Sequence, residues 1–180
     1  MAKSKNKVIK EVISWVMVVA AAFVLAFLIT HFVIIKTEVI SGSMESTLNI
    51  DDRVIGNRLV YVFSEPKRGD IIFFANPLNE AETYVKRIIG CPGEIVEISD
   101  GKVYINGAAV PLDEPYLKEK MKGSFGPYVV PENSFFVMGD NRNRSEDSRV
   151  WGFVARDEIY AKAWFRYKPS IDAVEAATYE

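Results

Sequence analysis

One uninterrupted apolar segment limits how this chain can fold. Residues 12–35 read VISWVMVVAAAFVLAFLITHFVII, and their only clearly polar members are Ser14, Thr30 and His31. About 20 apolar residues are enough for a helix to cross the roughly 30 Å hydrocarbon core of a bilayer. A secretory signal peptide has a shorter apolar run, of about 7–15 residues, and a buried helix of a soluble protein would show a polar face. We therefore predict a retained transmembrane anchor.

Lysines are distributed unequally around this segment. Four of them lie within residues 1–11, whereas Lys36 is the only one soon after the segment. Positive residues are retained on the cytoplasmic side of a membrane. The sequence therefore predicts a single-pass protein of the cell membrane, with a basic cytoplasmic tail at 1–11, an anchor at 12–35 and an extracytoplasmic domain at 36–180.

Charge and cysteine content exclude several kinds of function. The chain has 22 basic and 24 acidic residues, and without the four N-terminal lysines and Glu11 these fall to 18 and 23, a net charge of −5. Such a domain lacks the basic surface that nucleic acid requires. Cys91 is the only cysteine, so neither an intrachain disulfide nor a cysteine-based metal cluster is expected. We interpret Cys91 as a small core residue.

Beyond the anchor the sequence favours strands over helices. Short runs of β-branched and aromatic residues alternate with Gly, Pro, Asn and Asp, as in antiparallel sheets with tight turns. The stretch 111–131 resembles a surface insertion, so we expect a small hairpin and insertion at about 95–131. The predicted fold is a mainly β domain, mostly antiparallel, on one helical anchor. The expected strands are 52–55, 57–63, 71–74, 84–89, 94–98, 102–105, 134–138 and 161–167.

Aromatic residues are frequent in this domain, and two of the expected strands carry adjacent pairs, Phe73-Phe74 and Phe135-Phe136. Most of these rings are expected in the core. Because aromatic rings are favoured at the membrane interface, we expect some of the domain's Phe and Trp residues to form an exposed patch that contacts the lipid bilayer. The candidates are Phe73, Phe74, Phe135, Phe136, Trp151, Phe153 and Trp164.

Ser43 lies in the sequence SGSMESTL, only eight residues beyond the apolar segment. A serine hydroxyl is a poor nucleophile until a neighbouring base removes its proton. The only histidine, His31, lies inside the predicted span, so a Ser-His-Asp arrangement is excluded by composition. The remaining bases are a carboxylate or a lysine whose pKa is lowered by desolvation.

Lys86 differs from the other lysines because it is embedded in TYVKRIIG. In a strand it shares one face with Tyr84 and Ile88, whereas Arg87 points to the other face. We expect Lys86 to be buried and Arg87 to carry the solvated charge. Taken alone, an exposed strand lysine is the commoner arrangement, but few other candidate bases exist.

A polar stretch, GDNRNRSEDSR at residues 139–149, follows an expected strand. It has two simpler interpretations, a solvated loop and a calcium loop. A calcium loop of the EF-hand type requires glycine at its sixth position and glutamate at its twelfth. Counted from Asn141, these positions hold Glu146 and Gly152, which disfavours calcium.

Four motifs in this order carry a resemblance to a known family. SGSMESTL, RGDIIFF, TYVKRIIGCPGE and GDNRNRSEDSRVWG follow an N-terminal anchor, and together they resemble the successive sequence boxes of type I signal peptidase in its compact bacterial form. The resemblance covers nearly the whole chain, including AKAWFRY at 161–167. It implies a serine–lysine protease that needs no metal or other cofactor and removes signal peptides from exported preproteins.

The resemblance also assigns roles to the matching positions. Ser43 would be the nucleophile and Lys86 the general base. Ser145 would hydrogen-bond the lysine amine, and the Ser41 hydroxyl would form an oxyanion hole with the main-chain N–H of Ser43. The expected structural supports of the site are Asp147 paired with Arg149, and similarly Asp140 and Arg142. Ser46 departs from the family pattern, which has proline there, so the stiffness of the turn after the nucleophile is in question.

The short tether places Ser43 within roughly 30 Å of the bilayer, since an extended chain covers about 3.3–3.6 Å per residue. A substrate whose own helix ends at the membrane fits this position. An extended cleavage segment would add to the strand edges near Val39-Ile40 and Tyr84-Val85, with Met44 completing shallow pockets. Cleavage after small residues of the Ala-x-Ala type is implied by the family.

Two alternatives to a signal peptidase remain open. One is a non-catalytic anchored β domain that binds exported chains. The other is a self-cleaving repressor-type protease with the same serine–lysine chemistry, although a membrane span stands where such proteins have a DNA-binding segment.

Overall fold

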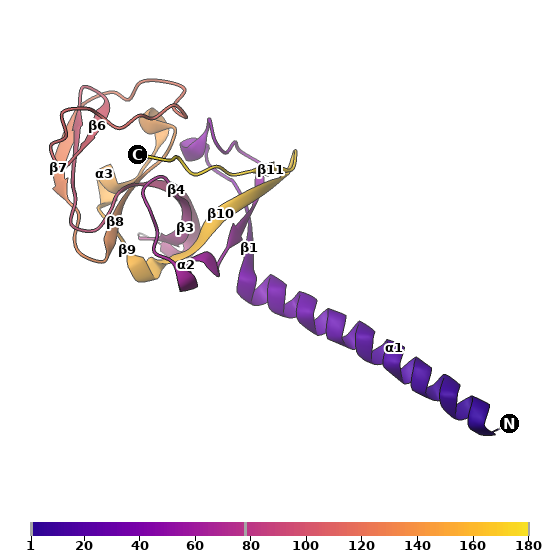
Figure 1. Cartoon of the computed structure of the whole chain (residues 1–180). Coiled ribbons are helices and arrows are strands. Elements are labelled where there is room, and N and C mark those ends of the chain that lie inside the picture. Colours follow the sequence, from indigo (N-terminus) through magenta and orange to yellow (C-terminus); the bar gives the residue numbers. More distant parts are fainter. Residues whose placement is uncertain (1, 78, 180) are drawn as a thin grey trace.

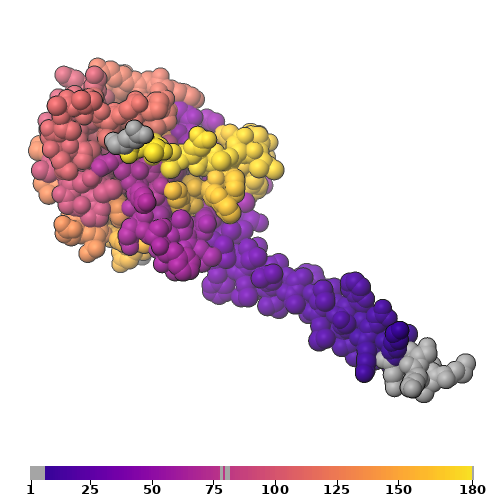
Figure 2. All heavy atoms as spheres, in the orientation of Figure 1, coloured from indigo at the N-terminus to yellow at the C-terminus, as the bar shows by residue number. Residues whose placement is uncertain are grey.

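The long N-terminal helix stands apart from a rounded body (Figure 1). The structure is a computed structural model that describes residues 2–77 and 79–179. Helix α1 spans Ala2–Leu28 and continues as a π-helical turn, η1, at Ile29–Val33. By length and apolarity, Lys7–Val33 forms a helix able to cross a membrane, and none of its most apolar part is buried inside the protein. Figure 2 shows how completely this helix is separated from the body.

Strand β1 (Ile34–Glu38) follows the helical segment without a linker. It pairs antiparallel with β2 (Arg53–Asn57), with Lys36 opposite Ile55. The carbonyl of Val33, the last helical residue, accepts a hydrogen bond from the Arg58 N–H at 2.8 Å. The helical part therefore ends at Val33, two residues earlier than the expected anchor boundary, because Ile34 and Ile35 are used in strand pairing.

The main sheet confirms the predicted mainly β, antiparallel fold. Its strand order is β1-β2-β10-β3-β4-β8-β9, with β11 paired to β10, and every pairing in it is antiparallel. Strand β4, the longest strand of this sheet, lies between β3 and β8. The remaining strands of this sheet are β3 (Ile71–Asn76), β4 (Asn79–Gly90), β8 (Ser134–Met138), β9 (Val154–Ala155), β10 (Ile159–Lys168) and β11 (Asp172–Ala173).

A second sheet of three strands lies in the region where a hairpin and insertion were expected. Strands β5 (Ile95–Ser99) and β6 (Lys102–Ile105) form a hairpin. Strand β7 (Phe125–Val129) pairs with the other side of β5, and the sequence did not indicate it, since its segment contains Gly126 and Pro127. In Figure 1 this sheet lies on the side of the body away from α1.

One expected strand, residues 57–63, was wrong. Strand β2 ends at Asn57, whose side-chain oxygen accepts a hydrogen bond from the Leu59 N–H at 2.9 Å and turns the chain. Residues Val60–Phe63 then form a short helix, α2. The β-branched run predicts a strand locally, but the turn at Asn57 leads away from the sheet and leaves Phe63 84% exposed. The other short helical elements are η2 (Gly42–Met44), η3 (Arg142–Arg144), α3 (Ser148–Trp151) and η4 (Arg156–Glu158).

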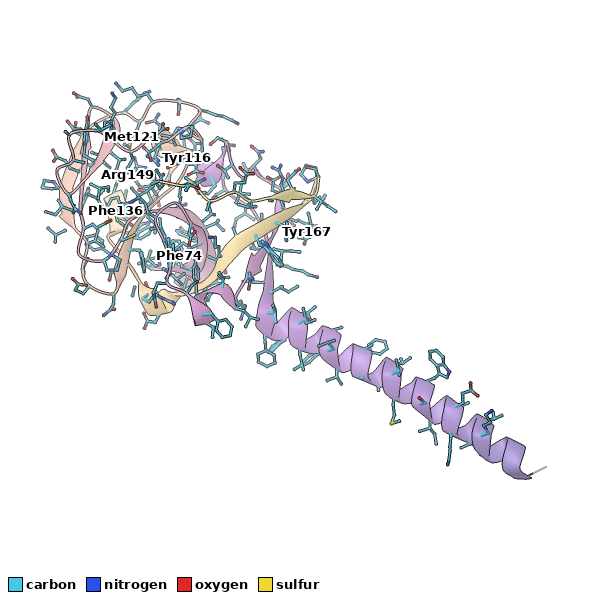
Figure 3. All side chains as sticks on the ribbon, viewed as in Figure 1. Phe74, Tyr116, Met121, Phe136, Arg149 and Tyr167 are labelled. Atoms are coloured by element: carbon cyan, nitrogen blue, oxygen red, sulfur yellow. The ribbon has the colours of Figure 1, made fainter. Side chains whose placement is uncertain are left out.

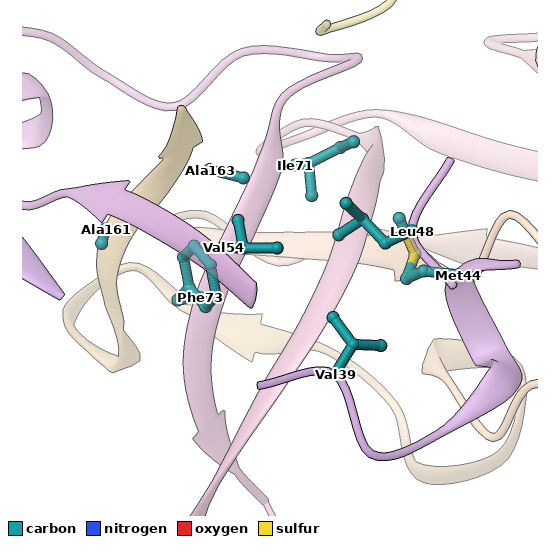
Figure 4. Packing of buried hydrophobic residues seen from close by; sticks show 8 residues of the cluster. All are labelled: Val39, Met44, Leu48, Val54, Ile71, Phe73, Ala161 and Ala163. Carbon is teal, nitrogen blue, oxygen red and sulfur yellow. The ribbon is translucent and has the colours of Figure 1, made fainter. Parts of the chain in front are cut away.

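The paired phenylalanines belong to the interior. Phe73, Phe74, Phe135 and Phe136 are all buried, so neither pair contributes to an exposed aromatic patch, whereas Trp164 is half exposed. Phe73 belongs to a core cluster with Val39, Met44, Leu48 and Val54 (Figure 4). This cluster packs the segment before and after Ser43 against β2 and β3, and so fixes the position of the candidate nucleophile.

Candidate active site

Ser43 is held in a tight turn with its neighbours anchored in the core. It is the central residue of the 3-10 turn η2, and its side chain is buried. The next residue, Met44, points into the core cluster beside Leu48 and Val39 (Figure 4). The apolar residues on both sides of the polar SGS sequence therefore hold the serine, while its hydroxyl is left to polar partners.

Lys86 is brought to Ser43 by the pairing of β4 with β3, in which Lys86 lies opposite Ile72. The lysine is 4% exposed, and its Nζ donates a hydrogen bond to Ser43 Oγ at 2.6 Å. The hydroxyl oxygens of Ser41 and Ser43 lie 3.3 Å apart. The ring centroid of Tyr84 is 5.3 Å from Lys86 Nζ. Two residues 43 positions apart in the sequence thus meet in the buried arrangement that nucleophile activation requires.

Burial is the main influence on the protonation of Lys86. Desolvation disfavours the charged amine and lowers the pKa of Lys86 from 10.5 to about 8, although the negative charges of Asp147, Asp140 and Glu146 act in the opposite direction. An amine with a pKa near 8 is substantially neutral at mildly alkaline pH, and only the neutral form accepts a proton.

The 139–149 loop closes over the turn that carries Ser43. Asn141 donates from its backbone N–H to the Ser43 carbonyl at 3.0 Å, and its side-chain Nδ2 donates to the Gly42 carbonyl at 2.9 Å. Gly139 permits this close approach, because a Cβ there would lie 2.4 Å from the Ser43 carbonyl oxygen and 2.3 Å from Ser145 Oγ. The loop therefore packs directly against the candidate nucleophile.

Ser145 lies in this contact region, but its hydroxyl is buried and forms no hydrogen bond with the described residues. The hydrogen bond to the Lys86 amine that the resemblance implies is therefore not formed here. A buried hydroxyl without a partner is rare and costs about 1–3 kcal/mol.

Asp147 and Arg149 are paired, as the resemblance implies. Arg149 donates from Nε to Asp147 Oδ1 and from Nη2 to Oδ2, both at 2.8 Å. Asp147 also caps α3 through the Arg149 N–H and accepts from the Gly139 N–H at 3.0 Å. On its other side, Arg149 Nη1 reaches Met121 Sδ at 3.4 Å; both residues are labelled in Figure 3. This ion pair joins the loop to the insertion.

Asp140 and Arg142 do not pair with each other. Asp140 accepts two hydrogen bonds from Arg87, and Thr47 Oγ1 donates to it at 2.5 Å. Arg142 instead pairs with Glu114, with Nη2 to Oε1 at 2.6 Å. Asp140 and Arg142 point in different directions, so each reaches a partner outside the loop. Asp140 supports the loop through Arg87, and Arg142 supports it through Glu114.

The expectation that Arg87 carries a solvated charge was wrong. Its side chain is 1% exposed, and its guanidinium lies 4.0 Å from the ring centroid of Tyr116. Alternation along β4 does place Arg87 on the face opposite Lys86, but Asp140 of the 139–149 loop and Tyr116 of the insertion cover its side chain there. Reasoning from the sequence missed Arg87, Thr47, Glu114 and Asn141, although all but Glu114 lie in or next to the four motifs.

The residues expected to bind substrate surround one hollow. It has a volume of about 600 Å³, and Ser43 and Lys86 lie on its wall. Strand β4 pairs with β8 only from Arg87 onward, so Tyr84 and Val85 pair with β3 on one side, and no strand among the described residues pairs with the other edge of β4 there. The apolar residues of the hollow are Val39, Ile40, Met44, Tyr84 and Val85.

Ser46 adopts a backbone conformation that proline cannot adopt. Its φ is +99°, whereas proline is locked near −65°. Glu45 has φ −54° and ψ 138°, and the Thr47 N–H donates to the Met44 carbonyl at 3.0 Å. Together these values define a type II turn with Ser46 at the position usually held by glycine. The departure from the family pattern therefore changes the shape of the turn.

Comparison with known proteins shows that this chain is similar to signal peptidases. Residues 12–168 match the family model described as signal peptidase, peptidase S26. A signal peptidase I of Leptolyngbya laminosa is 41% identical over 177 residues, covering 93% of this chain and 85% of the relative. Signal peptidase IB of Staphylococcus aureus (strain COL) is 33% identical over 178 residues, covering 89% and 91%. A crystal structure of a signal peptidase I from Enterococcus faecalis V583 aligns with a TM-score of 0.49 at 39% identity, over 55% of this chain and 97% of that chain.

Proposed function

We propose that this chain, which belongs to the signal peptidase family, peptidase S26, is a membrane-bound serine endopeptidase that cleaves N-terminal signal peptides from exported preproteins with a Ser43–Lys86 dyad. The observation that carries this proposal is the 2.6 Å hydrogen bond from Lys86 Nζ to Ser43 Oγ. It supports a nucleophile and base in contact, in a buried setting that lowers the pKa of the amine to about 8.

In the proposed reaction the neutral Lys86 amine takes the proton from Ser43 Oγ as the oxygen attacks the scissile carbonyl. The carbonyl oxygen becomes negative and is stabilised by the Ser41 hydroxyl and the Ser43 N–H, since each donor aimed at a developing oxyanion contributes about 3 kcal/mol. The Lys86 ammonium then protonates the leaving amine of the mature protein. Water, deprotonated by the regenerated amine, hydrolyses the acyl-serine and releases the signal peptide.

Ser145 is proposed to orient the lysine. Its hydroxyl is buried beside the Ser43 carbonyl and has no hydrogen-bond partner among the described residues. Its oxygen is therefore available to accept a hydrogen bond from the Lys86 ammonium, which has one more N–H to satisfy than the neutral amine. Asp147–Arg149, Asp140 and Arg142 are proposed to hold the loop that carries Ser145.

The substrate is proposed to bind as an added strand. Ile40 is exposed beside Val39, and within the described part of the chain no strand pairs with the second edge of Tyr84-Val85, so an extended segment has two backbone edges to pair with. The apolar side chains of these residues and Met44 line the hollow, which suits apolar side chains of a substrate. Cleavage after small residues of the Ala-x-Ala type is proposed from the family resemblance.

Membrane attachment is proposed through α1, with the N-terminus cytoplasmic and the body outside. The helix is long and apolar enough to span a bilayer, and the excess of lysines before it favours this orientation. The partners are therefore the lipid bilayer and the signal peptides of exported preproteins, and neither nucleic acid nor metal is required.

A purified preprotein with alanine at the two recognition positions tests the proposal. The detergent-solubilised full chain is expected to release the mature protein, and Ser43→Ala and Lys86→Ala are expected to abolish release. Lys102→Ala serves as the matched control, because Lys102 is exposed on β6, in the second sheet. Cleavage retained by either dyad variant would falsify the dyad assignment. A preprotein with bulky residues at the recognition positions should resist cleavage.

A further inference from the structure

Asn141 contacts two carbonyl groups of the turn that presents the nucleophile, those of Gly42 and Ser43. Its backbone N–H donates to the Ser43 carbonyl at 3.0 Å, and its side-chain Nδ2 donates to the Gly42 carbonyl at 2.9 Å. We propose that Asn141 is a positioning residue that sets the orientation of the Gly42–Ser43 peptide, and with it the direction of the Ser43 N–H that stabilises the oxyanion. This inference rests on the proposed function.

The geometry of a trans peptide links the two groups. Its carbonyl and N–H point in opposite directions in one plane, so a donor bound to the Gly42 carbonyl directs the Ser43 N–H to the opposite side of the peptide. Gly42 has no side chain to restrict its rotation. The Gly42 carbonyl also accepts from the Glu45 N–H at 3.2 Å, so one bond within the turn and one from the loop hold it.

The direction of the Asn141 amide is itself determined by its neighbours. Nδ2 donates to Glu45 Oε2 at 3.1 Å as well as to the Gly42 carbonyl. Both partners are acceptors, and the amide oxygen has no proton to offer either of them. The NH₂ group must therefore face the turn, which makes Glu45 a partner that keeps the Asn141 side chain in place.

Gly139 adds a second constraint from the same loop. A side chain at this position would collide with the Ser43 carbonyl oxygen, which a Cβ would approach to 2.4 Å. The loop therefore contacts the carbonyl side of the turn at both residues, through its backbone at Ser43 and through the Asn141 side chain at Gly42. In this proposal the opposite, N–H side of the Gly42–Ser43 peptide is the one offered to a substrate, which is the arrangement that a preorganised oxyanion hole needs.

Loss of this support should affect the chemical step more than substrate binding. The oxyanion exists only after Ser43 has attacked, and interactions made only in the transition state change kcat with little change in KM. A displaced catalytic group of this kind lowers the rate by roughly ten- to a hundredfold. The pKa of Lys86 should be little affected by Asn141→Ala, since the amide carries no charge.

The test compares Asn141→Ala with Asn143→Ala in the detergent-solubilised full chain, with a peptide substrate spanning a signal-peptide cleavage site. Asn143 lies in the same loop, but its amide bonds to Lys120 and Lys122 of the insertion, at 3.1 and 2.9 Å. We expect Asn141→Ala to lower kcat at least about tenfold with KM within about twofold and an unshifted acid limb of the pH profile. Asn143→Ala should stay within about twofold of wild type.

A second measurement isolates the oxyanion. A peptide boronic acid forms a tetrahedral anion on a nucleophilic serine, whereas an uncleavable peptide of the same sequence binds without forming one. Asn141→Ala should weaken boronate binding at least about tenfold and leave the uncleavable peptide nearly unchanged. If both ligands weaken equally, or if kcat matches that of Asn143→Ala, Asn141 does not act on the oxyanion and the inference is overturned.

If Asn141→Ala melts at a lower temperature than wild type, Asn141→Asp tests the role of Asn141 instead. It keeps the side-chain shape and replaces the donor by an acceptor that faces the Gly42 carbonyl, so kcat on the alkaline plateau should fall as far as in the alanine variant or further. A plateau kcat equal to wild type would overturn the inference. Failure of the wild type to cleave, or cleavage that survives Ser43→Ala, would instead refute the proposed function.

Discussion

Arg87 and Asp140 are joined by two parallel hydrogen bonds in the interior, from Nε to Oδ1 at 2.9 Å and from Nη2 to Oδ2 at 2.8 Å. Both side chains are essentially inaccessible to water. Arg87 directly follows Lys86, and Asp140 directly precedes Asn141. One buried ion pair therefore connects the strand that carries the candidate base to the loop that contacts the candidate nucleophile.

Breaking this ion pair should strongly destabilise the fold. Replacing Asp140 by Asn leaves the Arg87 charge buried without its counter-ion, and such changes cost about 3–5 kcal/mol. Urea unfolding of the detergent-solubilised chain measures the difference. Arg53→Ala is the control, because the Arg53–Glu38 ion pair is nearly half exposed and exposed pairs contribute about 0–1 kcal/mol. Equal losses in the two variants would contradict the role given to the buried pair.

Activity should depend on pH with an acid limb centred near 8. Lys86 acts as a base only when neutral, and its pKa is lowered to about 8, so kcat/KM should rise as pH increases through this value and then level off. The Glu146 charge favours the ammonium form. Glu146→Gln should therefore shift the limb to lower pH. A profile that is flat between pH 6 and 9 would rule out Lys86 as the base.

Replacing Lys86 by Met should abolish activity and stabilise the fold at neutral pH. A buried amine with a pKa of about 8 in place of 10.5 costs on the order of 3 kcal/mol when it is protonated. This cost is complete below pH 8 and disappears as pH rises from 8 towards 10.5, because the unfolded chain then also loses its proton. Melting temperatures of the Met variant and wild type should therefore converge over this range.

The exposed Lys102 provides the comparison for that stability measurement. Lys102→Met should leave the dependence of the melting temperature on pH unchanged, because Lys102 lies on the surface of β6. If Lys86→Met is less stable than wild type at pH 7, the amine is not held in the strained, desolvated state described for it.

Ser46→Gly should stabilise the turn after the nucleophile by about 1 kcal/mol. Ser46 has a left-handed backbone and a buried hydroxyl without a partner among the described residues, and glycine removes both costs. Ser46→Pro should destabilise, since proline cannot reach φ +99°. Ser134→Gly, in the regular strand β8, should cost about 0.5–1 kcal/mol. Thermal unfolding measures the stability of these variants. A loss of stability in Ser46→Gly would show that the turn at Ser46 is not strained.

The mainly β fold could be predicted from the sequence, and the four motifs could be recognised in it, because both depend on local patterns. Alternation along 84–89 placed Lys86 and Arg87 on opposite faces of β4 as expected. It could not show that both faces are covered, because the cover over Arg87 comes from the distant 139–149 loop and the insertion. The strand expected at 57–63 failed for a similar reason: a side-chain hydrogen bond at Asn57 decides the direction of the chain, and β-propensity does not record it.

The partners of the loop residues were also out of reach. Asp147 and Arg149 are two residues apart, so their pairing is local. Asp140 pairs with Arg87 across 53 positions and Arg142 with Glu114 across 28, and side-chain direction within an irregular loop follows no period. Asn141 was missed because its amide matters only once the loop lies on the 42–43 turn.

The direct passage from η1 into β1 has a mechanical consequence if α1 spans the bilayer as proposed. With Val33 bonded to Arg58 and Ile34 already paired with β2, the described residues 29–38 include no linker, which limits how far the body can rise or tilt above the lipid. The Ser43 hydroxyl is then held at a nearly constant height above the lipid surface. An exported chain can contain several sequences with small residues. Only a sequence that lies at the same distance from the membrane as the Ser43 hydroxyl can then reach this hydroxyl.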